Sequence, residues 1–139
     1  MQRDGGPGGA GGAGNPTGGS FTGAAETLEL IGNHCYAYSG TFNPTGAAST
    51  YLSFRTGNYY VVGVVEINCD WAGTGGSNLS IEIYLNGVRI VFEREVANDY
   101  VPGDTEFKVI IPPYTEVQVD ITGSTAPANA NITGRVYRG

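Results

Sequence analysis

The sequence predicts an all-β protein, and three observations lead to this fold class. Apolar and polar residues alternate with a period of two from about residue 27 onward, which is the pattern of half-buried strands. Gly, Pro and Asn clusters separate these runs and predict turns. No segment repeats with the period of a helix. We therefore expect a jelly-roll β-sandwich of about eight antiparallel strands, preceded by an extended Gly-rich N-terminal tail.

The expected strands follow directly from the alternation and from the turn signals between them. Most are short, as in sandwiches that have turn signals at regular spacing. The candidate strands span residues 27–31, 35–38, 49–54, 59–69, 79–85, 88–92, 107–111, 117–121 and 132–137.

A hairpin is the clearest local prediction. Asn86-Gly87 lies between two alternating runs, and this dipeptide is preferred in two-residue type I′ turns because both central residues need positive φ. We expect Val88, Ile90 and Phe92 to resume the inward-facing set after the turn.

The longest strand, 59–69, is apolar on both faces in its first half. One face is apolar throughout, whereas the other begins with Tyr60, Val62 and Val64 before it becomes polar at Glu66. A strand that is apolar on both faces needs a cover on each. We expect Tyr60, Val62 and Val64 to form a subunit interface; a local loop over them is the alternative.

The N-terminal tail has Gly at every third position. Gly5, Gly8, Gly11 and Gly14 keep this register up to Pro16, and a period of three is typical of three extended chains that meet at a crowded axis. The alternative is a flexible linker. The sequence thus predicts a tail over 1–24, acting in attachment or trimer threading, and a head domain over 25–139.

Charge and hydropathy exclude several classes of function. The net charge is −6 and the seven basic residues are scattered, which argues against a phosphate-binding surface and hence against direct nucleic-acid binding. No run approaches the length of apolar sequence that a transmembrane helix needs, and the N-terminus lacks the order of a secretory signal. We expect no membrane association and no cofactor.

The cysteines and the histidine are expected to be structural. Cys35 and Cys69 lie on predicted strands, where a thiol usually behaves as a small buried hydrophobic group; a disulfide between them stays open as an alternative. His34 is the only imidazole and is expected in a loop or at a strand end. Because His34 and Cys35 are adjacent, their side chains would point to opposite faces, which disfavours a zinc site.

Catalytic and calcium-binding patterns are weak. No Gly-x-Ser-x-Gly elbow marks a nucleophile, so we expect a protein that is not an enzyme. Glu93 and Glu95 would lie together on the outer face of a strand, where charge opposes edge-to-edge pairing. The 98–106 stretch contains oxygen ligands but lacks the spacing of a calcium loop, so no metal site is predicted.

Several motifs resemble a known superfamily. The motifs begin at Gly57-Asn-Tyr-Tyr60, Leu85-Asn-Gly87, Ile111-Pro-Pro and Ile132-Thr-Gly. In order and spacing they are similar to the jelly-roll heads of the tumour necrosis factor and complement-head superfamily, and the Pro-Pro turn with the closing Thr-Gly-Arg-Val-Tyr137 resembles small trimeric virion proteins of tailed phages.

This resemblance implies a non-enzymatic virion structural protein. It would be a homotrimeric capsid decoration or spike protein, located in the virion and assembled in the host cytoplasm. Its partners would be further copies of itself and a major capsid or other virion protein, with Gly5, Gly8, Gly11 and Gly14 attaching it to the shell.

A carbohydrate- or receptor-binding module, such as a fibre tip or adhesin, is the alternative function. Trp71, Tyr100 and Tyr114 are candidates for stacking on a surface glycan, since aromatic residues with a polar tip suit such contacts. Ordinary half-buried packing in a sheet explains the same residues equally well.

Overall fold

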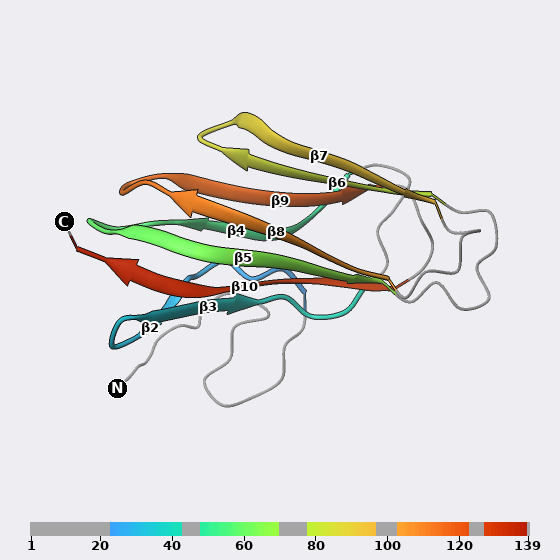
Figure 1. Cartoon of the computed structure of the whole chain (residues 1–139). Helices are drawn as coiled ribbons and strands as arrows, with labels where there is room; N and C mark the ends of the chain where they lie inside the picture. Colours follow the sequence, from blue (N-terminus) through green and yellow to red (C-terminus); the bar gives the residue numbers. More distant parts are fainter. Residues whose placement is uncertain (1–22, 43–47, 70–77, 97–102, 123–126, 139) are drawn as a thin grey trace.

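The computed structural model describes residues 23–42, 48–69, 78–96, 103–122 and 127–138 (Figure 1). Across these ranges the regular structure consists of strands, and no helix capable of crossing a membrane occurs in them. The strands are β2 (Glu29–Ile31), β3 (His34–Tyr38), β4 (Ser49–Arg55), β5 (Tyr60–Cys69), β6 (Asn78–Leu85), β7 (Val88–Val96), β8 (Gly103–Ile111), β9 (Glu116–Thr122) and β10 (Ala128–Tyr137).

The strands form two antiparallel sheets with the pairing of a jelly roll. One sheet has the order β2-β3-β10-β5-β8 and the other β4-β9-β6-β7. The pairs β3 with β10, β4 with β9, β5 with β8 and β6 with β7 nest inside one another along the chain. From β3 to β10, this nesting places consecutive strands in alternate sheets except at the innermost β6–β7 hairpin, as in a rolled-up hairpin. The predicted fold class is confirmed, with β2 as an additional edge strand.

The core lies between the two sheets. Alternate residues of each strand point inward, and those of the central strands are almost completely buried. They include Val61, Val65 and Ile67 from β5, Ile81 and Ile83 from β6, and Val117, Val119 and Ile121 from β9. The fully apolar face predicted for the 59–69 strand is thus part of the core at these β5 positions.

Two glycines allow β5 and β10 to approach closely. Gly63 and Gly134 are paired opposite each other. A Cβ atom on Gly63 would lie 2.9 Å from the Thr133 carbonyl oxygen, and one on Gly134 would collide with the carbonyl oxygen of Val62. Glycine at these positions therefore permits a backbone contact that any side chain would prevent.

The hairpin prediction is confirmed at its turn, but the facing predicted beyond it is wrong. Asn86 and Gly87 have φ values of 52° and 80°, as a type I′ turn requires. A register shift between Ile83 and Tyr84 in the β6–β7 pairing leaves Ile90 as an extra residue. A bulge of this kind reverses the alternation beyond it, so that Val91 packs on the core while Ile90 and Phe92 are exposed. Val88 lies before the bulge, next to the turn, and is exposed there.

Several strands extend further than the alternation predicts. β8 begins at Gly103 and β10 at Ala128, several residues before the predicted starts. Residues 103–106 therefore pair with β5 as part of a strand, although the alternation places them before the predicted strand. Gly5, Gly8, Gly11 and Gly14 lie outside the described residues.

Candidate functional site

The open side of the sandwich is formed by the edge strands β7 and β8. β8 ends the five-stranded sheet and β7 ends the four-stranded sheet. Because β4 packs against β10, the sheets are stacked with these two edges on the same side of the molecule. The opposite side is better covered, since the backbone of Ala25 hydrogen-bonds to Tyr51 and Ser53 of β4.

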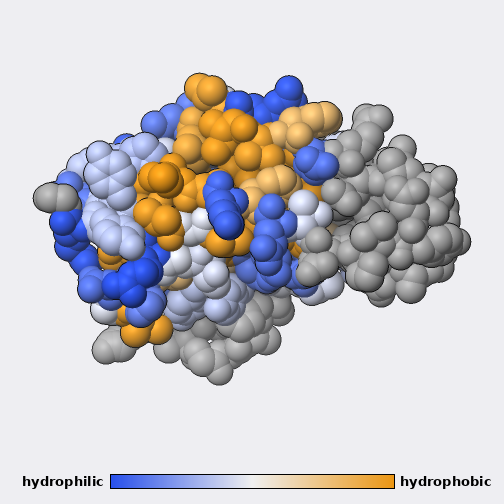
Figure 2. Space-filling model, in the orientation of Figure 1, coloured by the Kyte–Doolittle hydropathy of each residue, from blue (hydrophilic) through white to orange (hydrophobic). Residues whose placement is uncertain are grey.

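Hydrophobic residues gather over β7 and β8 on this open side (Figure 2). Val88, Ile90 and Phe92 of β7 are 65%, 47% and 50% exposed, and Ile110 of β8 is 66% exposed. We call these four residues the apolar edge. Soluble monomers rarely leave large contiguous apolar patches in water, so the apolar edge is a candidate contact surface.

The predicted subunit interface on β5 adjoins this edge. Tyr60 and Val62 are 46% and 45% exposed on the outer face of the five-stranded sheet, and Val64 is half-buried there. Val62 lies directly opposite Ile110 of β8, and Tyr60 lies opposite the exposed Tyr137 of β10. Tyr60 and Val62 are thus exposed within the described part of the chain, and their assignment to a subunit interface or to a covering loop stays a prediction.

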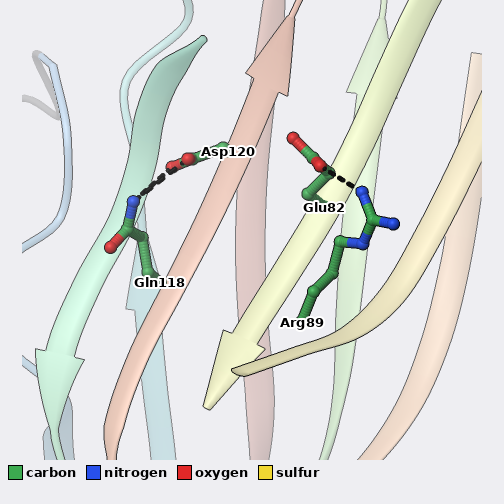
Figure 3. A network of polar contacts seen from close by, with 4 residues as sticks. All are labelled: Glu82, Arg89, Gln118 and Asp120. Atoms are coloured by element: carbon green, nitrogen blue, oxygen red, sulfur yellow. Dashed lines mark hydrogen bonds and ion pairs between the residues drawn. The ribbon is translucent and has the colours of Figure 1, made fainter. Parts of the chain in front are cut away.

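Over β9 and β6, the outer face of the four-stranded sheet is polar and internally paired (Figure 3). Asp120 is only 7% exposed; it accepts hydrogen bonds from Thr50 Oγ1 at 2.9 Å and from Gln118 Nε2 at 3.0 Å. Glu82 on the neighbouring strand forms an ion pair with Arg89 at 2.8 Å. Each carboxylate thus has a partner from its own sheet, and the face offers few free polar groups.

Tyr84 completes this polar network. Burial raises the pKa of the Tyr84 phenol, and a hydrogen bond with Glu82 together with the charges of Glu82 and Asp120 raises it further. The guanidinium of Arg89 opposes this shift and lies over the ring of Phe92 at 4.8 Å. The network is therefore a structural feature of the outer face.

Cys35 and His34 lie where the sequence predicts them. Cys35 is a free, buried thiol, and burial raises its pKa, so Cys35 behaves as a core residue and the disulfide alternative is wrong. His34 is exposed at the start of β3. Among the residues that the structure describes, no three His, Cys, Asp or Glu side chains converge in a group that could hold a metal ion.

Only one of the three candidate stacking residues can be located. Trp71 and Tyr100 lie outside the described residues. Tyr114 is 56% exposed in the turn between β8 and β9, where its φ is 53° and its backbone N–H donates to the Gly57 carbonyl. The stacking role of these three aromatic residues therefore stays a prediction.

Sequence reasoning missed Ile110 and the exposure of the apolar edge. Ile110 lies in the run Val109-Ile-Ile111, where an apolar residue on the outer face looks the same as one in the core. A bulge at Ile90 has no clear sequence signal either, because the bulged residue is itself apolar. These side chains stay exposed because their strands lie at the edges of the sheets, and the order of strands in a sheet follows from topology.

Comparison with solved structures finds viral proteins. The VP2 subviral particle of infectious bursal disease virus matches with a TM-score of 0.42 and 16% identity, over 72% of this chain and 30% of that one. The T13 particle of the same virus matches with a TM-score of 0.40 and 17% identity, over 68% and 28%. The matched region thus spans less than a third of either viral chain. No protein-family model and no curated protein matches.

Proposed function

We propose that this protein is a non-enzymatic structural protein of a virion. In this proposal it is a homotrimeric capsid decoration or spike protein, assembled in the host cytoplasm, whose head is the jelly roll and whose Gly-rich N-terminus attaches it to the shell. Its partners are two further copies of itself and a major capsid or other virion protein.

The apolar surface of the isolated chain is the observation that carries this proposal. The apolar edge and the neighbouring Tyr60 and Val62 leave six large hydrophobic side chains about half exposed or more. Burying such a surface in an interface stabilises the assembly by about 25 cal/mol for each Å² of apolar area removed from water. Association with further copies supplies this cover, whereas a working monomer in water would gain nothing from the exposed groups.

The topology supports the same class of function. Double-sheet jelly rolls recur in viral capsid and lectin domains, although a fold alone does not determine a function. In the described residues, Glu82 pairs with Arg89 and Asp120 accepts hydrogen bonds from neutral side chains on the outer four-stranded face, and His34 stands exposed at a strand end. This arrangement suits a building block better than a catalytic site.

Closure into a ring sets a requirement on the interface. In a cyclic trimer each subunit presents two different patches that fit each other. Tyr60, Val62 and Val64 supply one such patch in our proposal. Assembly through this patch places the outer face of the five-stranded sheet near the trimer axis.

The N-terminal tail is proposed to act through its lack of side chains. Gly5, Gly8, Gly11 and Gly14 would let the chain lie in a groove of the shell, or beside two other tails, where a Cβ atom would clash. Replacement of these four residues by Val should abolish incorporation into particles while the head stays folded.

Incorporation into virions tests the proposal. Particles are assembled in cells that express either the native or the four-Val chain, purified, and analysed by mass spectrometry; circular dichroism of the purified variant checks the head. The expected result is native protein in the particles and a folded variant outside them. Absence of the native chain from particles would refute the virion role, and unchanged incorporation of the variant would refute the role of the tail.

A further inference from the structure

The outer face of the five-stranded sheet carries a second feature beside the apolar residues. A shallow depression of about 400 Å³ is lined by Tyr38, Val64, Glu66, Glu106, Asn131 and Thr133. A second depression of about 430 Å³ adjoins it and shares Tyr38 and Thr133. Volumes in this range are typical of ligand sites, which combine an apolar wall with a few placed polar groups.

Strand register places the polar groups of the first depression in one row. Tyr38 lies opposite Asn131, Asn131 opposite Glu66, and Glu66 opposite Glu106, so the row crosses β3, β10, β5 and β8. With a spacing of about 4.8 Å between strands, the row is about 14 Å long. Four strands thus hold these side chains on a rigid surface.

The two carboxylates of this row have no protein partner that would explain their position. Glu66 and Glu106 are directly opposite each other, and like charges at such positions destabilise a sheet. Within the described part of the chain, neither forms an ion pair or a side-chain hydrogen bond. An ionised carboxylate only accepts hydrogen bonds, so a ligand that satisfies this pair must donate them.

The rest of the row provides an aromatic surface and groups for mixed hydrogen bonding. Tyr36 and Tyr38 of β3 have ring centroids 5.0 Å apart with planes tilted by 39°. Asn131 donates to Asn129 Oδ1 at 3.3 Å, which leaves its own amide oxygen as an acceptor. Thr133 adds an exposed hydroxyl between the tyrosines and the carboxylates.

We propose that this row binds a neutral oligosaccharide. Sugar hydroxyls can donate hydrogen bonds to the carboxylates of Glu66 and Glu106 and to the side-chain amide oxygen of Asn131. An apolar face of the sugar ring packs on the tyrosines. Glu66 and Glu106 repel the carboxylates of sialylated or uronic glycans at their end of the row, and the cations of this face, Lys108 and Arg135, do not line the first depression. The site goes beyond the proposed structural role, and it lies on a sheet face, away from the Tyr114 turn.

The depression lies beside the proposed subunit interface. Val64 belongs to both, whereas Glu66 is two residues further along β5 than Val64, or about 6.6 Å. In a trimer the three depressions would lie at the rim of the interface, and three linked sites bind a multivalent glycan more tightly than one.

A glycan array tests this site, and calorimetry then measures the affinity for the glycans that bind. The array carries neutral galactose-, glucose- and mannose-terminated oligosaccharides, their sialylated counterparts, and a Lys-rich peptide as a cationic probe. The full chain is expected to bind at least one neutral oligosaccharide and to bind neither the sialylated glycans nor the peptide. Binding to the peptide alone, or to no neutral glycan, overturns the proposal.

Matched variants locate the site. Glu66→Ala, Glu106→Ala and Asn131→Ala should each weaken binding by about tenfold or more, because hydrogen bonds to charged groups contribute strongly. Glu93→Ala removes an exposed carboxylate from β7, and Tyr114→Ala removes the exposed turn aromatic; both should bind as the native chain does. Thermal unfolding confirms that every variant is folded. Loss of binding in Tyr114→Ala with retention in Glu66→Ala would place the site at the turn instead and refute the proposal.

Discussion

The outer faces of the two sheets hold carboxylates in different surroundings. On the four-stranded sheet, Asp120 is buried by its neighbours and accepts hydrogen bonds from Thr50 and Gln118. On the five-stranded sheet, Glu66 and Glu106 face each other across β5 and β8 and, within the described residues, have no donor. The carboxylates of the first face are paired within the chain, whereas those of the second are left, among the described residues, to water or to a partner.

In our proposals, one face contributes to stability and the other to recognition. A buried polar group contributes to stability only when its hydrogen bonds are made, and removing one partner leaves the other unsatisfied. Exposed groups without protein partners can be changed at little cost to folding. Substitutions on the two faces should therefore have opposite consequences for unfolding and for binding.

The largest effect is expected at the close backbone contact between β5 and β10. Gly134→Val would place a side chain against the Val62 carbonyl oxygen and the Gly63 Cα, so β10 would have to move away from β5. We expect a loss of about 3 kcal/mol in the free energy of unfolding, at the upper end of overpacking effects. Urea denaturation measures it. Thr133→Val, at the exposed neighbouring position, is the control and should change stability by less than about 0.5 kcal/mol; equal effects would contradict the close contact.

The next largest effect is expected when one carboxylate from each face is replaced and the two losses of stability are compared. Asp120→Ala leaves the Thr50 hydroxyl and the Gln118 amide without their acceptor, and we expect a loss of about 1–3 kcal/mol. Glu66→Ala should change stability by less than about 0.5 kcal/mol. Both values come from urea denaturation at neutral pH, and similar losses in the two variants would remove the distinction between the faces.

A smaller effect, an increase in stability, is expected from a substitution of Glu106. Glu106→Gln removes a charge that faces Glu66, so the free energy of unfolding should rise by about 0.2–1 kcal/mol. The gain should shrink in about 1 M salt, which screens the repulsion between exposed charges. A decrease in stability at low salt would show that Glu106 has a favourable partner in the free protein.

The smallest effect concerns alkaline pH and Tyr84. The pKa of Tyr84 is raised above its ordinary value of 10.0 by burial and by Glu82, so the folded state holds the phenolic proton more tightly than the unfolded state. Stability from this group is therefore present below about pH 10 and falls as pH rises beyond that value. The urea midpoint of the native protein should therefore fall between about pH 9 and pH 11, and Tyr84→Phe should make this fall smaller. An equal fall in the variant would show that other tyrosines cause it.

The fold could be predicted from sequence because its signals are local. Alternation in β5 and β6 and the Asn86-Gly87 turn determine strand positions and one hairpin without knowledge of the partners. The exposure of Ile90 and Phe92 could not be predicted, because a bulge changes the facing of every later residue. The row from Tyr38 to Glu106 was equally hidden, since its members come from four strands whose order in the sheet follows from topology.

Sedimentation of the purified chain tests the central claim, which is assembly through the outer face of the five-stranded sheet. At micromolar concentration the native protein should sediment with a mass close to three times its chain mass of 14.5 kDa. Val62→Glu, which places a charge on that face, should yield monomer, whereas Ser53→Glu, on the outer face of β4, should remain a trimer. A native monomer, or dissociation caused equally by both substitutions, would contradict the account.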